Sequence, residues 1–304
     1  MPRLRIGTRG SPLALWQAGE ARRLLIAAHG LAEADVEIVA ITTTGDRVRD
    51  RPLAEIGGKG LFTKEIEEAL LAGDIHLAVH SMKDMPARLP EGLAIPALLA
   101  RADPRDAFLS PVAKSLAALP EGAVVGSSSV RRTAQLLRLR PDLKTVQFRG
   151  NVETRLRKLG DGVAQATFLA AAGLQRLGLG DRITALVSID DMLPAVAQGA
   201  IGIEIRDDDR ATSDLVAAIH HDETGIAVSC ERAFLAALDG SCRTPLAGHA
   251  RIAAGALHFR GHALTMDGKH CFETTRSGAP GDAERLGRDA GEEVKRRGGA
   301  LIAF

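Results

Sequence analysis

Aromatic residues are scarce in this sequence: they make up 3% of its 304 residues, with one Trp and no Tyr. Proteins that bind single-stranded nucleic acid stack the bases on aromatic side chains, so this class of protein is disfavoured. Charge of one sign is also lacking, since the formal net charge is +1. Nucleic-acid and membrane-surface proteins normally carry an excess of Lys and Arg. The composition therefore predicts neither a nucleic-acid partner nor a membrane partner.

Cysteines are few, and no long apolar run is present. The three cysteines, Cys230, Cys242 and Cys271, are odd in number and form no C-x-x-C motif. This pattern fits neither a disulfide framework nor a structural zinc site, so we expect free thiols and no metal. No apolar stretch approaches the roughly 18 to 20 residues of a membrane span, and no signal peptide is evident. These absences together predict a cytoplasmic protein.

Short apolar or β-branched runs alternate with helical patterns over residues 1–205, as is typical of an α/β fold with largely parallel sheets. We expect strands at Leu4–Gly7, Val36–Thr42, Ile75–Val79, Val124–Gly126, Thr145–Phe148, Ala166–Leu169 and Ile201–Ile205. We expect helices at Pro12–His29, Leu61–Leu71, Val130–Arg138 and Val152–Leu159.

Two composition breaks, Arg101–Arg105 and Leu193–Gly199, enclose a segment of about the size of a small domain. The chain is therefore expected to cross between two lobes twice. The last part combines helical sequence through Leu238, strand-like runs over Leu246–Thr275 and a helix after Pro280, which is typical of an α+β domain.

At four places an expected strand or loop leads into a helix through small residues that lie close to a positive charge. A helix amino end carries unpaired N–H groups and a partial positive charge, so such junctions suit anions. The residues concerned are Arg9 with Ser11, Lys59 in G-G-K-G, Ser129 with Arg131 and Arg132, and Arg149 with Arg155.

Each junction alone has a structural interpretation, because Ser, Asn and Gly cap helices in most proteins. Four of them in a chain of balanced charge indicate a ligand with several negative groups. Nucleotide motifs fail: a P-loop around Lys59 would need Gly at position 53 and Ser or Thr at position 60, which are Leu53 and Gly60. A polycarboxylate or a simple oxyanion is the better candidate.

Two further positions suggest chemistry. Lys83 and Asp84 follow the expected strand Ile75–Val79, at the strand end where open α/β sheets bind ligands. Asp84 suits a general acid or a group that stabilises a cation, although a plain surface turn is the alternative. Cys242 lies in the loop G-S-C-R-T-P beside Arg243, where a thiolate is favoured, although an inert thiol is the alternative.

Six sequence blocks resemble the porphobilinogen deaminase family, in order and along essentially the whole chain. They are R-I-G-T-R-G-S-P-L-A-L-W-Q-A from Arg5, the segment Gly57–Pro86 ending in H-S-M-K-D-M-P, V-G-S-S-S-V-R-R-T-A-Q-L from Val125, F-R-G-N-V-E-T-R-L from Phe148, L-P-A-V-A-Q-G-A-I-G-I-E from Leu193 and G-S-C-R-T-P from Gly240.

This resemblance implies a transferase of tetrapyrrole and haem biosynthesis that joins four porphobilinogen molecules into the linear hydroxymethylbilane and releases four ammonia. It also implies a dipyrromethane cofactor bound as a thioether to Cys242, and Asp84 as the catalytic acid. The implied cofactor-binding residues are Lys83, Asp84, Ser129, Arg131, Arg132, Arg149 and Cys242. The implied substrate-binding residues are Arg9, Ser11, Lys59, Arg149, Arg155 and Arg176.

The resemblance further implies two periplasmic-binding-protein-like lobes with mixed, largely parallel sheets, and a smaller C-terminal α+β domain. The expected boundaries are 1–99 with 198–216 for the first lobe, 100–197 for the second and 217–304 for the domain that carries the cysteine loop. We expect a monomer. Ser241, Gly10 and Gln165 depart from residues common in the family, without removing a named chemical group.

Two rival interpretations stay open at this point. A non-enzymatic two-lobed anion carrier would also use helix ends and arginines, but it would need neither Cys242 nor Asp84. A nucleic-acid-binding protein would use the basic run R-R-T-A-Q-L-L-R-L-R from Arg131, against which the low aromatic content weighs.

Overall fold

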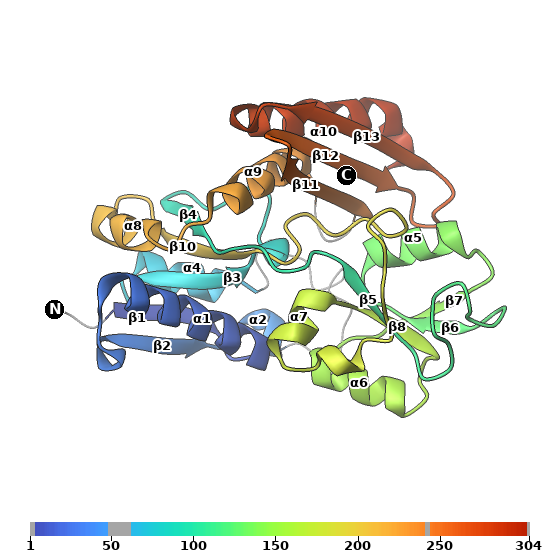
Figure 1. Cartoon of the computed structure of the whole chain (residues 1–304), viewed down its shortest axis with the longest axis horizontal. Coiled ribbons are helices and arrows are strands. Elements are labelled where there is room, and N and C mark those ends of the chain that lie inside the picture. The colour runs from blue at the N-terminus through green and yellow to red at the C-terminus, as the bar shows by residue number, and fades with distance from the viewer. Residues whose placement is uncertain (1–3, 48–61, 241–243, 303–304) are drawn as a thin grey trace. The chain divides into compact units, whose positions relative to one another are not determined.

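The computed structural model describes residues 4–47, 62–240 and 244–302 (Figure 1). The chain divides into two compact units, Met1–Ala102 with Ala200–Gly225, and Asp103–Gly199 with Ile226–Phe304. The first two passages between the units fall at the composition breaks, and the third falls inside helix α9 (Asp222–Ala237). The finer division into three domains with the boundaries given above stays a prediction.

The first unit contains a five-stranded sheet in the order β2 (Val36–Ile41), β1 (Leu4–Arg9), β3 (Leu77–Ser81), β10 (Ile201–Arg206) and β4 (Leu93–Leu98). Strand β1 pairs in parallel with β2 and β3, whereas β10 is antiparallel to both β3 and β4. Buried aliphatic side chains such as Ile6, Leu77 and Ile203 form its core with helix α1 (Pro12–His29). The carboxyl ends of β1 and β3 therefore meet at one edge of the sheet.

Helix α1 begins and ends where local sequence dictates. The Ser11 side chain caps it by accepting a hydrogen bond from the Ala14 amide at 3.3 Å, and Pro12 occupies the first helical position. Gly30, with φ of 61°, ends it in the left-handed conformation. Ala14, Ala18 and Leu25 lie on the buried stripe. This capping places the open amino end of the helix beside the end of β1.

The second unit contains a five-stranded sheet in the order β7 (Lys144–Val146), β6 (Val124–Gly126), β8 (Ala166–Ala170), β5 (Asp106–Leu109) and β9 (Ala185–Leu186). Strand β6 pairs in parallel with β7 and β8, and β5 is antiparallel to β8 and β9. Phe108 and Phe168 pack in its core with ring centroids 5.7 Å apart. Four strands run in one direction and one in the other, as in the first sheet.

The same unit contains an antiparallel three-stranded sheet, β11 (Leu246–Ala253), β12 (Ala256–Leu264) and β13 (Cys271–Gly278). Helix α10 (Ala283–Gly298) packs along β12 and β13 (Figure 1). It also lies against α9, so closely that a Cβ atom at Gly287 would be 2.0 Å from the carbonyl oxygen of Cys230. Only glycine allows the two helices to approach in this way.

The remaining α-helices of the described residues are short. They are α2 (Thr44–Arg47), α4 (Lys64–Leu71), α5 (Val130–Leu139), α6 (Val152–Gly160), α7 (Ala171–Arg176) and α8 (Arg210–Ala217). A search of the described part of the chain finds no helix with the length and apolarity of a membrane span.

The predicted fold class is confirmed: the chain is α/β, with two mixed, largely parallel sheets and a smaller C-terminal α+β part. The expected strands and helices are all present, with shifts at their ends; α4, for instance, begins at Lys64 rather than Leu61. The sequence patterns missed β4, β5, β9, α2 and α7, each of which has at most six residues. Cys230 lies inside a helix and Cys271 in a strand, as expected.

Candidate functional site

A pocket in the first unit lies at the carboxyl ends of β1 and β3 and at the amino end of α1. Its lining includes three residues chosen from the sequence, Arg9, Ser11 and Asp84. The Arg9 guanidinium carbon lies 4.2 Å from the ring centroid of Phe62, which holds this cation at the rim. The helix end and the guanidinium together give one wall of the pocket a positive potential suited to a carboxylate.

Asp84 and Lys83 lie in the short 3-10 helix η2 (Met82–Asp84), which follows β3 directly. Asp84 is exposed and Lys83 is half-buried. Met82 anchors this turn: its side chain is buried, and its amide donates a hydrogen bond of 3.1 Å to the Ala200 carbonyl of the first unit. The Asp84 carboxylate is therefore presented to solvent at the pocket from a rigid base.

Two buried polar pairs support the floor of this pocket. Gln17 of α1 exchanges hydrogen bonds with the Ser81 hydroxyl at 2.8 and 3.1 Å, which ties the helix to the end of β3. The Nε2 atom of His80 lies 2.9 Å from Oε2 of Glu204, and both side chains are almost fully buried. Sequence reasoning missed Gln17 and Glu204. The signal for Glu204 is an acidic residue in the middle of the apolar strand I-G-I-E-I-R.

A second acid, Glu67 of α4, is buried in the same unit. Burial raises the pKa of Glu67, while the hydrogen bond from Thr63 lowers it and the charge of Glu204 raises it further. The pocket is lined by Thr63 and His80, the polar neighbours of Glu67 and Glu204, and it has the cation Arg9 at its rim.

In the second unit, Ser129, Arg131 and Arg132 lie at the amino end of α5, as expected from the sequence. Ser129 caps the helix by accepting from the Arg132 amide at 3.4 Å. Both arginines are buried and share one carboxylate, Asp106 of β5: Nη2 of Arg131 lies 2.8 Å from Oδ2, and Nη2 of Arg132 lies 2.7 Å from Oδ1. Sequence reasoning missed Asp106, although an acid that opens the apolar run D-A-F-L is a recognisable signal.

The charges of this cluster are unequal. Burial would raise the pKa of Asp106, but the guanidinium groups of Arg131 and Arg132 and a hydrogen bond from Gln198 hold it well below its usual range. Burial lowers the pKa of Arg131. Two cations face one anion, so the cluster keeps a net positive charge beneath the start of α5.

Arg149 and Asn151 lie in the loop between β7 and α6, and Arg155 lies in the first part of α6. Asn151 caps α6 by accepting from the Thr154 amide at 2.9 Å, and Nε of Arg155 donates to the Gly150 carbonyl at 2.8 Å. The Ser128 hydroxyl accepts from the Phe148 amide at 2.9 Å and so links this loop to the α5 junction. Within the described chain, Nη1 of Arg149 is buried and has no hydrogen-bond partner. A buried guanidinium atom without a partner is the mark of a missing acceptor.

The other residues chosen from the sequence are placed as follows. Arg176 ends α7 and donates from Nη2 to the Gly199 carbonyl at 2.7 Å. Lys59 and Cys242 lie outside the described residues. The structure therefore brings Arg9, Ser11 and Asp84 together in the first unit. In the second unit it joins Ser129, Arg131 and Arg132, and it links them to the Arg149 loop through Ser128.

Comparison with known proteins gives a consistent result. Residues 4–214 match the family described as "Porphobilinogen deaminase, dipyromethane cofactor binding domain", and residues 226–296 match "Porphobilinogen deaminase, C-terminal domain". A porphobilinogen deaminase from Nitrobacter hamburgensis is 58% identical over 294 residues, which cover 97% of this chain and 93% of that protein. One from Paracoccus denitrificans is also 58% identical, over 97% of this chain and 94% of the relative.

The solved structures that match this chain share much less of its sequence. A nutrient binding protein from Burkholderia cenocepacia bound to methionine has a TM-score of 0.43 and 17% identity, and the match covers 71% of this chain and 91% of that one. A periplasmic substrate-binding protein of an ABC transporter from Coxiella burnetii has a TM-score of 0.45 and 16% identity, over 72% of this chain and 92% of that one.

Proposed function

The chain belongs to the porphobilinogen deaminase family, and from that premise we propose which residues hold the cofactor and the substrate and which residue acts on the reacting pyrrole. Enzymes of this family are transferases that condense four porphobilinogen molecules head to tail into hydroxymethylbilane and release four ammonia. They work with a dipyrromethane cofactor. This chain carries out the same reaction with that cofactor, which we propose is joined to Cys242 as a thioether.

The substrate decides what the site must supply. Porphobilinogen carries one acetate and one propionate, so each added ring brings two negative charges. In our proposal Arg9, Ser11 and the amino end of α1 bind such carboxylates in the first unit, together with Lys59. Arginine suits this role because it stays charged and grips a carboxylate with two parallel hydrogen bonds. Arg155 and Arg176 complete the proposed substrate-binding set.

The residues of the second unit fit a cofactor with carboxylate side chains. The supporting observation is the buried Nη1 atom of Arg149, which lacks an acceptor among the described residues. The net positive charge of Arg131 and Arg132 over Asp106 adds to the attraction. We assign Arg149, Ser129, Arg131, Arg132 and Lys83 to the cofactor carboxylates, and Asp84 to the N–H groups of the cofactor's pyrrole rings. When bound, the dipyrromethane supplies the free pyrrole α-carbon from which chain growth starts.

Asp84 is the proposed catalytic residue. Its carboxylate accepts hydrogen bonds from pyrrole N–H groups and helps to move a proton to the leaving amine. Loss of ammonia from porphobilinogen leaves an electron-poor azafulvene, and the nearby negative charge stabilises the positive charge on that ring. The observation that carries this assignment is the position of Asp84, exposed at a pocket that also holds Arg9 and Ser11. A carboxylate used as a surface turn alone would not need those anchors.

The test of Asp84 uses holoenzyme with the cofactor already assembled. Asp84→Asn removes the charge and keeps the shape, so we expect turnover of porphobilinogen to fall by at least about 100-fold. The exposed Asp74→Asn in the same unit serves as the matched control and should keep turnover within about twofold. Near-normal turnover of Asp84→Asn, with the cofactor present by mass, would assign the acid to another residue.

The attachment residue is tested by intact mass. Wild-type protein should carry a dipyrrole adduct, and Cys242→Ala should carry none. Cys271→Ser is the matched control and should keep the adduct, because Cys271 lies in β13 and is a free cysteine. An adduct on Cys242→Ala would refute the proposed thioether.

We also infer that the protein acts as a cytoplasmic monomer. The near-zero net charge gives no electrostatic reason to bind a membrane or nucleic acid, and the free thiols of Cys230 and Cys271 suit a reducing compartment. Light scattering on a size-exclusion column checks the monomer, and fractionation of cells checks the compartment.

A further inference from the structure

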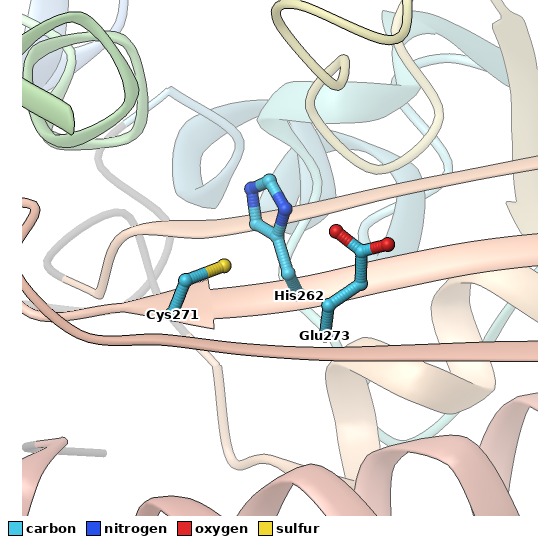
Figure 2. Close-up of side chains that lie close together, drawn as sticks. All are labelled: His262, Cys271 and Glu273. Atoms are coloured by element: carbon cyan, nitrogen blue, oxygen red, sulfur yellow. The ribbon is translucent and has the colours of Figure 1, made fainter. Parts of the chain in front are cut away.

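Three potential metal ligands lie together on the C-terminal sheet: His262, Cys271 and Glu273. His262 of β12 pairs directly with Glu273 of β13, and Cys271 is two residues before Glu273 on the same strand. Directly opposed residues and alternate residues share a face of a sheet, so all three side chains point the same way. Figure 2 shows them rising from one face of the two strands, with the thiol directed toward the imidazole. Their ligand atoms all lie within 4.8 Å of one another.

The imidazole of His262 is the independent sign that a ligand belongs here. The residue is only 6% exposed, and within the described chain its buried Nε2 has no hydrogen-bond partner. Burial, together with the nearby charges of Arg260, Arg131 and Arg138, lowers the pKa of His262 to about 3. The buried Nε2 atom is therefore available to bind a metal through its lone pair. A buried polar atom left without a partner needs such an explanation.

We propose that His262, Cys271 and Glu273 bind one divalent transition-metal ion of the zinc class. An imidazole nitrogen, a thiolate sulfur and a carboxylate oxygen are the ligands that zinc takes in proteins, and three of them leave a fourth tetrahedral position for water. Zinc bonds of about 2.0 to 2.3 Å place ligand atoms roughly 3.5 Å apart. The ligand atoms now lie within 4.8 Å of one another, and the exposed side chain of Glu273 can rotate to bring its carboxylate to the shorter distance.

The charges of the site balance. When the metal–sulfur bond forms, the Cys271 thiol releases its proton to solvent, so the thiolate and the Glu273 carboxylate together neutralise a doubly charged ion. Arg260 now holds Glu273 through two contacts of 3.1 Å, from Nε to Oε1 and from Nη2 to Oε2. The ion competes with Arg260 for this carboxylate. Arg131 and Arg138 of α5 also face the imidazole and oppose a cation, which favours a metal that binds through a soft thiolate over Mg²⁺ or Ca²⁺.

The sequence analysis expected no metal because the three cysteines form no C-x-x-C motif; the spacing H-x8-C-x-E of these residues is not a known zinc motif either. The hairpin between β12 and β13 is what brings these residues together. Its turn includes Gly268, where φ is 71° and a Cβ atom would be 2.3 Å from the Ala134 carbonyl of α5. A metal on this face would cross-link the two strands beside the contact with α5.

The experiment is a cobalt titration of metal-free holoenzyme. Holoenzyme is suitable because the proposed thioether occupies Cys242 and because Cys230 is fully buried. We expect one Co²⁺ per chain, with sulfur-to-cobalt charge-transfer absorption in the near ultraviolet that Zn²⁺ abolishes by displacement. Cys271→Ser should lose this absorption, and Glu273→Gln should keep it with affinity weakened at least about tenfold. His258→Gln, on the same strand and the same face, is the matched control and should bind as wild type.

Two results would overturn the proposal. One is the absence of the absorption band from wild-type protein at saturating Co²⁺. The other is binding by Cys271→Ser and Glu273→Gln with wild-type affinity and absorption, which would place the ion elsewhere. Melting temperatures of the metal-free variants show whether each is folded; Glu273→Gln, at an exposed position, provides a test even if the serine variant does not fold.

Discussion

The five-stranded sheets of the two units share one pattern of parallel and antiparallel pairing when β2-β1-β3-β10-β4 is set against β7-β6-β8-β5-β9, although the antiparallel strand comes last in the chain in the first sheet and first in the second. In both sheets, a serine caps the helix that follows the middle one of the three parallel strands. Ser11 caps α1 after β1, and Ser129 caps α5 after β6. In both, the single antiparallel strand carries a fully buried acid, Glu204 on β10 and Asp106 on β5. The partners of these acids differ.

Glu204 is paired with one histidine, whose charge depends on its proton, whereas Asp106 is paired with two permanently charged arginines. The first unit thus keeps its fixed cation, Arg9, at the rim of a pocket beside the exposed Asp84. The second unit keeps its fixed cations inside. One topology therefore holds two kinds of buried acid, one paired with a single imidazole and one with two guanidinium groups that give a constant positive field.

The largest expected effect is a difference in the free energy of unfolding between variants of the two buried acids, Asp106 and Glu204. Asp106→Asn leaves two buried guanidinium groups without their counter-charge, so we expect the free energy of unfolding to fall by about 3 to 5 kcal/mol. Glu204→Gln keeps a hydrogen-bond acceptor for His80 and should cost only about 1 to 2 kcal/mol. Urea unfolding of both variants checks this. The exposed Glu121→Gln is a control for the loss of one charge in the second unit. Equal losses for Asp106→Asn and Glu204→Gln would mean that the two clusters do not differ as described.

The second effect compares two glycines at equivalent strands, Gly126 of β6 and Gly7 of β1. A Cβ atom at Gly126 would lie 2.4 Å from the ring of Phe148, which is fully buried and cannot move aside. At Gly7 it would meet the terminal carbon of Ile75 at 2.2 Å, and that carbon can rotate away. We expect Gly126→Ala to cost about 1 to 3 kcal/mol and Gly7→Ala clearly less. Thermal unfolding measures both, and the reverse order would contradict the packing described.

The smallest effect is a dependence on pH. Because the pKa of Asp106 is lower in the folded chain than the unfolded value near 3.9, its stabilising contribution is complete above that pH. It is lost as the pH falls, by about 1.4 kcal/mol for each unit below about 3.9. The stability difference between wild type and Asp106→Asn should therefore be constant from pH 5 to 7, about the range where both fold best, and shrink in acid. If the stability difference between wild type and Asp106→Asn grows in acid, the pKa of Asp106 is raised in the folded chain and not lowered.

The parts of the fold that could be predicted are those whose ends are marked by local sequence signals. Ser11, Pro12 and Gly30 mark both ends of α1 in the sequence alone. Strand β5 escaped because four residues, Asp106–Leu109, are too few to show a period and begin with a charge. Long-range pairing is the reason why the partners of the buried acids could not be predicted. His80 and Glu204 are 124 positions apart, and no local sequence feature of either residue indicates the other as its partner.

The candidate site shows the same limit. Arg9, Ser11 and Asp84 were found because helix caps and strand ends leave local marks. That Arg131 and Arg132 are buried on Asp106 was not foreseen, since paired arginines after a serine run look the same whether they face solvent or a carboxylate. The proposed cluster of His262, Cys271 and Glu273 was not identified from the sequence, because a hairpin register and not a motif spacing aligns the three residues.

The place of β10 in its sheet has a consequence for synthesis on the ribosome. This strand lies between β3 and β4, yet it is translated about 100 residues after β4, which takes on the order of 5 to 20 seconds. During that interval β3 and β4 have no strand to join them, whereas β5 to β9 are contiguous in the chain and emerge together. The later-made half of the nascent polypeptide thus has all the strands of its five-stranded sheet before the earlier-made half does.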